Sequence, residues 1–542
     1  MKLLRQLLHE QHVRGYLSDD VLTAIAREEN VPLYRLEELV SFYTSFRRTP
    51  PPQLVIDVCR DACCADGDQN RLAQITSKLE KSDVQYEIRE VSCLGRCDAA
   101  PAAAINDHPL APVSFGDSGE FWDRVQTDPA RWPSLPVTSP RWKCNLYQSQ
   151  SEHYHTLQSL VSTGQNVSNI CIQRLKATNL TGRGGAGFPT GLKWEIVSRE
   201  MSETKFVICN ADESEPGTFK DREILRQAPH LVIEGMLFGA LTIGAERGII
   251  FVRHEYSPET AILQAAIDAA YSSGILGTNA AASGRRFELE VFVSPGGYIL
   301  GEETALLEAL EDRRGEPRNK PPYPGQHGLW CKPTLINNVE TFALIPAIIA
   351  HGPQWWKDQG IGDFSGLKFV CLSGDVNAPG VFEVPMGTTF ADVIQLAGGI
   401  REGKQLKAFL PGGASSLFLS SEKADTPIDF EAVKQAGSIL GTGAIMVFHQ
   451  DRDLYELAMN ITRFFRNESC GKCVPCRLGT TTAVELLQEI SIGERSSLQL
   501  EVLPELHETL LETSICGLGQ VALAPVLSLL KHFPEEIPGH VR

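Results

Sequence analysis

The sequence has no long hydrophobic run. A helix that crosses a membrane needs about 18 or more consecutive apolar residues. The longest candidate, residues 231–252, is interrupted by Glu234, Glu246 and Arg247. The first 20 residues mix His, Glu and Arg into an apolar pattern and have no cleavage site of small residues. They predict an amphipathic helix and not a signal peptide, so we expect a soluble, cytoplasmic protein.

Positive charge is also in short supply. The chain has 50 Lys and Arg against 67 Asp and Glu, a formal net charge of −17. This balance argues against nucleic acid or an anionic membrane as the main partner. No repeat of about 20–50 residues and no low-complexity segment is visible. A chain of 542 residues is too long for one hydrophobic core, so several domains are expected.

Cysteine is only moderately frequent, with 14 residues, but nine of the 14 stand in two groups. The front group is Cys59, Cys63, Cys64, Cys93 and Cys97, and the rear group is Cys470, Cys473, Cys476 and Cys516. In a chain without an export signal, grouped thiols indicate metal binding and not disulfides. The scattered five are expected to be buried apolar residues: Cys144, Cys171, Cys209, Cys331 and Cys371.

Periodicity divides the chain into six segments. Residues 1–50 predict three short helices, and residues 51–130 a small α/β domain with strands at 54–59 and 86–93 and a helix at about 70–81. Residues 131–160, with prolines and serines but no period, predict a linker. Residues 161–365 predict an α/β domain with strands at 205–210, 247–256 and 286–293. Residues 366–450 predict a small mixed domain, and residues 451–542 a helical one.

The rear cysteines have the spacing C-x2-C-x2-C plus a distant fourth thiol. Four such thiols suit a [4Fe–4S] cluster, because three from one turn bind three irons and tertiary folding supplies the last ligand. Zinc is the weaker alternative, since a third Cys at this spacing would crowd a tetrahedral site. A purely structural role would not bunch three thiols within seven residues.

The front cysteines form two pairs, Cys59 with Cys64 and Cys93 with Cys97, each following a predicted strand. Two such pairs could hold the two irons of a [2Fe–2S] cluster. Cys63 could replace Cys64 at a different spacing, but we favour Cys64. The alternative is a degenerate domain that has lost its cluster.

Three loops contain glycine, and two of them also carry acidic residues. GRGGAGF (182–188) matches G-x-G-x-x-G but follows a helical pattern, so it is not the usual dinucleotide fingerprint. Its glycines could still approach a phosphate or a flat ring, with a helix beginning near Pro189. NADESEPGTFKDRE (210–223) and GGYILGEETALLEALE (296–311) follow strands, where α/β sites form. The simpler interpretations are a solvated acidic face and acids that complement a helix N-terminus.

Taken together, these motifs resemble the NADH-binding flavoprotein subunit of respiratory complex I and its relatives. GRGGAGFPTGLKWE, NADESEPGTFKDRE, GEETALLEALE, KPPYP, LINNVETF and SCGKCVPCR…SICGLG occur in the family's order across about 160–542. The residues before 135 resemble the thioredoxin-like [2Fe–2S] subunit, fused here into the same chain. The implied fold is α/β multidomain: an N-terminal helical bundle, a thioredoxin-like domain, a Rossmann-like FMN/NAD domain, a small β-grasp domain and a helical [4Fe–4S] domain.

The resemblance also implies site residues. Those that would cradle FMN are Gly182, Arg183, Gly184, Gly187, Lys193, Asn210, Asp212, Tyr298, Gly301, Asn337 and Asn338. Those that would line the NAD(H) pocket are Phe188, Glu213, Glu215, Glu302, Glu303, Lys320 and Tyr323. The chain departs from the family at Ser294, Pro295 and Leu300, which makes the surroundings of Tyr298 less certain.

The implied activity is electron transfer between NAD(H) and iron–sulfur clusters. NAD(H) exchanges two electrons as a hydride and the clusters take one at a time, and FMN converts between the two. We expect the β subunit of an NAD-dependent formate dehydrogenase with a Mo/W catalytic partner, because the front thiols are complete. The alternatives are the flavoprotein of an NAD-reducing hydrogenase, a complex I module, or a scaffold without activity.

Overall fold

The computed structural model describes residues 1–67, 76–77, 80, 84–109, 142–147 and 149–539. Most of the helix predicted at about 70–81, and the front part of the predicted linker, lie outside the described residues. Within the described part of the chain, no helix is long and apolar enough to cross a membrane. The boundaries of the six predicted segments stay predictions, and the elements are given below in chain order.

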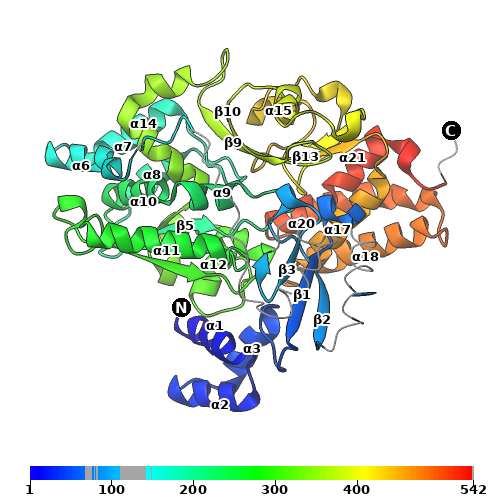
Figure 1. Ribbon diagram of the computed structural model, residues 1–542, viewed down its shortest axis with the longest axis horizontal. Coiled ribbons are helices and arrows are strands. Elements are labelled where there is room, and N and C mark those ends of the chain that lie inside the picture. The colour runs from blue at the N-terminus through cyan, green and yellow to red at the C-terminus, as the bar shows by residue number, and fades with distance from the viewer. Residues whose placement is uncertain (68–75, 78–79, 81–83, 110–141, 148, 540–542) are drawn as a thin grey trace.

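The chain begins with three helices, α1 (Lys2–Arg14), α2 (Asp19–Glu28) and α3 (Leu33–Phe42). Ser18 caps α2, because its hydroxyl accepts a hydrogen bond from the backbone N–H of Val21. These helices lie beside the large α/β domain, seen in blue below the green elements in Figure 1. Tyr43 Oη donates to the carbonyl of Arg313 at 2.6 Å, which ties the bundle to that domain.

A four-stranded sheet follows, with the order β2-β1-β3-β4. Its strands are β1 (Leu54–Cys59), β2 (Tyr86–Val91), β3 (Ala103–Ile105) and β4 (His108–Pro109). β1 runs parallel to β2 and antiparallel to β3. Two short 3-10 helices, η1 (Ala62–Gly67) and η2 (Cys97–Ala99), carry cysteines of the front group.

The large α/β domain contains a four-stranded sheet with the order β7-β6-β5-β8, in which every pair is parallel. Its strands are β5 (Phe206–Ala211), β6 (Arg247–Val252), β7 (Glu288–Val293) and β8 (Thr334–Asn338). The strand predicted at 247–256 ends at Val252, because the next residues form a turn in which Tyr256 N–H donates to Arg253 O.

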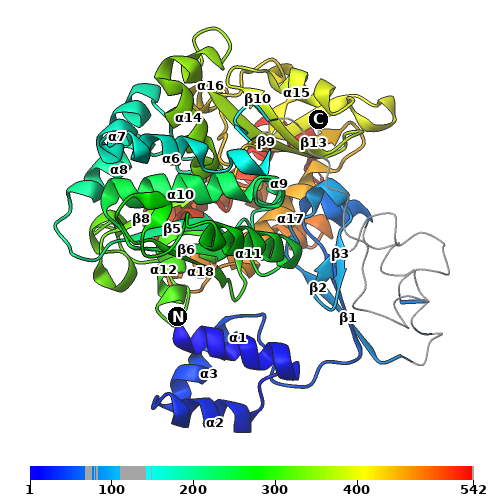
Figure 2. The same cartoon turned by 60° about the vertical axis from the view of Figure 1, so that its left-hand side comes forward.

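Helices cover both faces of this sheet (Figure 2). They are α6 (His155–Ser162), α7 (Val167–Thr178), α8 (Thr190–Arg199), α9 (Lys220–Gln227), α10 (Pro229–Ile243), α11 (Ser257–Ser272), α12 (Glu303–Leu310), α13 (Pro324–His327) and α14 (Val339–Asp358). From β5 the chain builds outward through β6 to β7, and β8 then returns to the other side of β5. The carboxyl ends of β5 and β8 therefore flank a switch point, where α/β proteins bind ligands.

The small domain is a mixed five-stranded sheet with the order β10-β9-β13-β11-β12. Its strands are β9 (Leu367–Gly374), β10 (Gly380–Pro385), β11 (Leu406–Leu410), β12 (Leu419–Ser420) and β13 (Ala444–His449). Its helices are α15 (Phe390–Leu396) and α16 (Phe430–Gln435). Phe390, Val393 and Ile394 of α15 are buried against the sheet.

The chain ends in a helical domain around the rear cysteines. Its helices are α17 (Leu454–Asn467), α18 (Val474–Ser491), α19 (Leu503–Thr513), α20 (Gly517–Val521) and α21 (Ala524–His532). The predicted fold class, an α/β multidomain chain that ends in helices, is confirmed. The front sheet, the large domain, the small domain and these helices meet near the centre of the molecule (Figure 1).

Candidate functional site

The loop of residues 182–188 connects α7 to α8, as the helical pattern before it predicted. Gly182 N–H donates to Phe188 O at 2.9 Å, which closes the loop on itself. Gly185 and Gly187 have φ of 106° and 65°, where a side chain is strained. No described atom lies within 4 Å of where a Cβ on Gly187 would sit. The loop is thus an open backbone cradle of the kind that suits a phosphate or a flat ring.

Polar side chains stand at the ends of β5 and β8, and that of Asn338 lies next to this cradle. A Cβ on Gly184 would lie 3.2 Å from the Cβ of Asn338. Asn210 Nδ2 donates to Gly301 O at 2.8 Å, and Trp194 Nε1 donates to Asn337 Oδ1 at 3.1 Å. The switch point therefore brings together residues that are separated by 91 to 154 positions in the sequence.

Asp212 follows β5 and is buried. One of its carboxylate oxygens accepts the Ser214 hydroxyl at 2.6 Å. The other, Oδ2, has no hydrogen-bond partner in the described part of the chain, and burial raises the pKa of this carboxyl to about 6. A buried acceptor without a partner is costly, so Oδ2 is available to a donor on a bound group.

Tyr298 and Gly301 belong to the short turn η6 (Tyr298–Gly301) after β7. The ring of Tyr298 lies 5.1 Å from that of Phe464 and 6.1 Å from that of Phe465, measured between ring centroids. Both phenylalanines belong to α17, so the turn joins the large domain to the helical domain that holds the rear cysteines. Leu300 is fully buried.

The predicted NAD(H) residues fall into two sets. Glu302, Glu303 and Lys320 form a partly exposed cluster. In it, Lys320 Nζ lies 2.7 Å from Glu302 Oε1 and 3.0 Å from Glu303 Oε1. Glu302 also caps α12 by accepting the N–H groups of Thr304 and Ala305. Phe188 and Tyr323 are exposed aromatics, and aromatic faces of this kind can stack on a flat nucleotide ring.

Glu213, in contrast, is buried, and Glu215 is half-buried. The Glu213 carboxyl accepts the N–H groups of Asp221 at 2.9 Å and Arg222 at 3.1 Å, so it caps the start of α9. Its side chain therefore faces a helix and not an open pocket, contrary to the sequence expectation. Glu215 Oε1 accepts the N–H of Ser415 at 2.8 Å, which links the acidic loop to the small domain.

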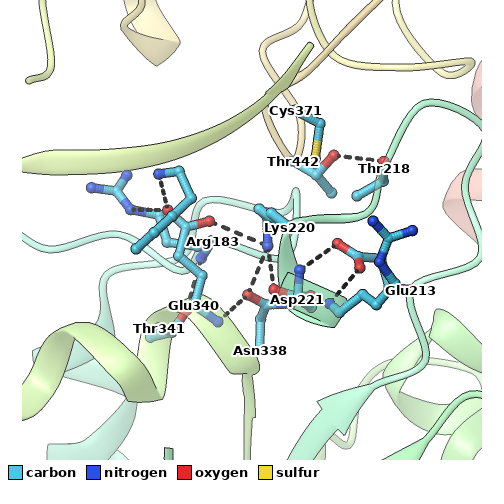
Figure 3. Close-up of polar contacts among 12 residues, drawn as sticks. Arg183, Glu213, Thr218, Lys220, Asp221, Asn338, Glu340, Thr341, Cys371 and Thr442 are labelled. Atoms are coloured by element: carbon cyan, nitrogen blue, oxygen red, sulfur yellow. Dashed lines mark hydrogen bonds and ion pairs between the residues drawn. The ribbon is translucent and has the colours of Figure 1, made fainter. Parts of the chain in front are cut away.

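A buried charge network, missed by the sequence reasoning, lies against the cradle (Figure 3). Its members are Arg183, Lys220, Asp221, Glu340 and Lys368. Lys220 Nζ lies 2.6 Å from Asp221 Oδ1 and 3.2 Å from Glu340 Oε2. Lys368 Nζ lies 3.3 Å from Glu340 Oε2. Arg183 was predicted to face FMN, but its guanidinium donates to Leu367 O, so only its backbone faces the cradle.

The rear thiols converge as predicted. Cys470, Cys473, Cys476 and Cys516 line one cavity, together with Ile299, Pro317, Ser469, Lys472, Ile515 and Leu518. Cys470 and Cys473 precede α18, Cys476 lies in its first turn, and Cys516 directly precedes α20. Burial raises the pKa of Cys476 to about 11 and that of Cys516 to about 12. Buried thiols of this kind become thiolates only when a metal centre replaces their protons.

The front thiols also gather. Cys93 Sγ lies 3.5 Å from Cys97 Sγ. The Cys64 and Cys93 thiols beside Cys59, together with its burial, hold the Cys59 pKa well above its usual value. Cys63 is different, because its Sγ lies 3.5 Å from Ser373 Oγ and it packs in a separate core cluster. Two pairs at the ends of β1 and β2 thus meet, with Cys63 on the other side of the loop.

We therefore expect Cys64→Ser to abolish the electron paramagnetic resonance signal of a reduced [2Fe–2S] cluster. Cys63→Ser, its matched neighbour, should leave that signal intact, since its thiol faces Ser373 in the small domain. Low-temperature spectra of the two reduced variants provide the measurement. The reverse result would mean that Cys63 is the ligand.

Buried arginines connect the front thiols to the acidic loop of the large domain. Arg222 donates to Gly95 O at 2.5 Å and pairs with Asp98 at 2.6 Å. Arg253 donates to Cys93 O and, at 3.0 Å, to Glu213 O. Gly217 N–H donates to Cys97 Sγ at 3.3 Å. No local sequence signal identified these contacts, because each joins residues from segments far apart in the chain.

The scattered cysteines follow the sequence prediction with one exception. Cys144, Cys171, Cys209 and Cys371 are buried, but Cys331 is exposed. It lies in the loop before β8, where Trp330 and Cys331 both have positive φ. A thiol in an irregular surface turn has no core to enter, which the composition of the segment did not reveal.

Family models match four parts of the chain. They are the Nuo51 FMN-binding domain over residues 175–347, the NADH-ubiquinone oxidoreductase-F iron-sulfur binding region over 456–540, the thioredoxin-like [2Fe-2S] ferredoxin over 1–117 and the SLBB domain over 369–418. The F subunit of NADH-quinone oxidoreductase from Escherichia coli K12 is 40% identical over 420 residues, which cover 77% of this chain and 94% of that protein. The chain belongs to the NADH-quinone oxidoreductase F-subunit family.

Other relatives of the chain are hydrogenase subunits. NADP-reducing hydrogenase subunit HndC of Solidesulfovibrio fructosivorans is 42% identical over 371 residues, covering 68% of this chain and 76% of that protein. A crystal structure of NAD⁺-reducing [NiFe]-hydrogenase in the air-oxidised state matches with a TM-score of 0.87 at 30% identity. That match covers 100% of this chain and 95% of the hydrogenase chain, so it includes the fused front domain.

The cofactors of this family member are FMN, NAD(H), a [4Fe–4S] cluster and a [2Fe–2S] cluster. The residues present fit them. The open space at Gly187 and the unpaired Asp212 Oδ2 suit a bound flavin, the four rear thiols line one cavity, and Cys93 Sγ lies 3.5 Å from Cys97 Sγ in the front group. The chain is thus an NADH dehydrogenase-type flavoprotein subunit. The ligand role of each named residue stays a prediction.

Proposed function

We propose that the chain is the diaphorase subunit of an NAD-dependent formate dehydrogenase, with a Mo/W catalytic partner. The observation that carries this proposal is the front domain. Its four paired thiols are retained and lie together, with Cys93 Sγ 3.5 Å from Cys97 Sγ. A complete set of this kind is expected in the formate dehydrogenase relatives, whereas the resemblance suggests that it is often degraded in hydrogenase flavoproteins.

The site supports the exchange of electrons between NAD(H) and the clusters. FMN supplies the conversion between two-electron and one-electron transfer. The chain's own residues orient the reactants: the loop 182–188 with Asn210, Asn337 and Asn338 holds the flavin, and Phe188, Tyr323 and the Glu302–Glu303–Lys320 cluster hold the nucleotide. Tyr298 packs on Phe464 between the flavin turn and the rear cysteines. We propose no side chain as nucleophile or general base.

A second candidate is the flavoprotein of an NAD-reducing hydrogenase. The full-length likeness to such an enzyme, with a TM-score of 0.87, favours it. A complex I module is a third candidate, supported by the relatives from NADH-quinone oxidoreductases, but the fusion of the front domain to the flavoprotein disfavours it. The cytoplasmic location is part of the proposal.

Purification of the intact complex from its native source separates these candidates. We expect the chain to co-purify with a Mo- or W-containing subunit and the complex to reduce NAD⁺ with formate but not with H₂. Metal analysis and the two activity assays provide the measurement. Nickel in the complex, with NAD⁺ reduction by H₂ alone, would assign the chain to a hydrogenase and reject the formate proposal.

A further inference from the structure

The buried network beside the flavin cradle carries an excess of positive charge. Arg183, Lys220 and Lys368 are opposed by only two carboxylates, Asp221 and Glu340. All five side chains are at most 3% exposed. An unbalanced charge is strongly disfavoured in the interior of a protein, so a network built in this way predicts an anion nearby.

The neighbouring acids do not supply that anion. The Glu213 carboxyl faces the start of α9, where it accepts the N–H groups of Asp221 at 2.9 Å and Arg222 at 3.1 Å, and it also accepts the hydroxyl of Tyr256 at 3.1 Å. Asp429 is half-buried and caps α16, where its Oδ1 accepts the N–H of Glu431 at 2.9 Å. In addition, Arg183 Nε is buried and has no hydrogen-bond partner among the described residues.

The network touches the flavin cradle at several points. Arg183 belongs to the glycine loop, and its backbone N–H donates to Thr341 Oγ1 at 2.9 Å. Glu340 and Thr341 lie in the first turn of α14. Asn338 caps that helix, accepts Lys220 Nζ at 3.2 Å and donates to Asp221 Oδ2. The N–H groups of a helix N-terminus favour a bound anion.

FMN differs from riboflavin by one phosphate, which is the anion that such a network fits. We propose that Lys368 is a positioning residue for the FMN phosphate: the positive charge that it adds to the network is balanced by that phosphate. Lys368 acts through its neighbours, since its Nζ is bonded to Glu340 and, at 2.8 Å, to Thr442 O.

The residue comes from β9 of the small domain and not from the flavin domain itself. The preference for FMN over riboflavin therefore depends on how the two domains are docked. This inference rests on FMN binding to the glycine loop and is independent of the partner complex.

Lys368→Met tests the proposal. The flavin-free protein is titrated with FMN and, separately, with riboflavin, and binding is followed by quenching of flavin fluorescence. We expect FMN affinity to fall at least about tenfold while riboflavin affinity stays within about twofold. In the variant, the two remaining cations are balanced by the two carboxylates, so no excess positive charge is left for the phosphate. Lys434→Met, on an exposed position of the same domain, is the matched control and should behave like the wild type.

Two companion variants keep the test decisive. Lys368→Arg keeps the positive charge and should keep the preference for FMN. This variant supplies the test if Lys368→Met folds poorly. Glu340→Gln breaks the same contacts but increases the excess positive charge, so its FMN-to-riboflavin affinity ratio should equal or exceed that of the wild type. Equal losses for both flavins in Lys368→Met and Glu340→Gln would show that Lys368 only joins the domains, and would overturn the proposal.

Discussion

Replacing Cys516 by serine is expected to lower the iron content of the purified protein and to stop electron transfer from reduced flavin to the partner subunits. The same result is expected for serine at Cys470, Cys473 or Cys476, because all four thiols line one cavity. A [4Fe–4S] cluster needs one protein ligand for each iron. Iron analysis and low-temperature spectra of the NADH-reduced complex provide the measurement.

Hydride transfer from NADH to FMN serves as an internal control for this prediction. Flavin reduction needs the cradle and the nucleotide pocket but not the cluster, so NADH should still bleach the flavin absorbance of these variants. Cys331→Ser is the matched control, since Cys331 is exposed and lies outside both thiol groups. Four serine variants that each keep full iron would contradict the ligand assignment.

Glu303→Gln is expected to raise kcat/KM for NADPH at least about tenfold while FMN stays bound. The resemblance places Glu303 beside the ribose of the nucleotide, where a carboxylate can accept a hydrogen bond from the 2′-hydroxyl. The 2′-phosphate of NADPH would instead meet a like charge. At a separation of 4 Å, that repulsion costs about 1 kcal/mol at the dielectric constant of water and about 4 kcal/mol at an effective value typical of a protein surface, or roughly five- to a thousand-fold in affinity.

The structure adds a reason to expect this change. Lys320 Nζ lies 3.0 Å from Glu303 Oε1 and 2.7 Å from Glu302 Oε1, so two carboxylates share one ammonium group. Removing the charge of Glu303 leaves Lys320 with one partner and a greater attraction for a phosphate. Steady-state kinetics with both nucleotides measures the effect. If the ratio of kcat/KM for NADPH to kcat/KM for NADH is unchanged, Glu303 only complements the N-terminus of α12.

Sequence reasoning located most of the site because its signals are local. Cysteine spacing identified both thiol groups. The acidic loops at 210–223 and 296–311 follow strands, as the alternating pattern predicted, whereas the glycine loop at 182–188 connects two helices. The direction of individual side chains was less accessible. Glu213 and Arg183 stand in motifs that suggest ligand contact, yet one caps α9 and the other reaches Leu367 O. Both outcomes depend on segments that local patterns do not bring together.

The buried network was beyond local reasoning for the same reason. Lys220 and Lys368 are separated by 148 positions, and their shared partner Glu340 lies on a third segment. One signal was present, since Lys368 interrupts the apolar run of residues 367–372. A lysine in a buried strand needs a partner, but the sequence alone does not say which carboxylate supplies it.

Asn460 of α17 accepts the N–H of Ala62 at 2.8 Å and donates to the carbonyl of Arg60 at 2.9 Å, contacts that span 398 and 400 positions. The ribosome adds about 5–20 residues per second. Roughly 20–80 s therefore pass between the synthesis of the front cysteine loop and the synthesis of Asn460, which hydrogen-bonds to it. The loop between Cys59 and Cys64 therefore lacks its hydrogen bonds to Asn460 while most of the chain is translated. Cells that make this protein have that interval in which to protect the nascent thiols or to load them with iron.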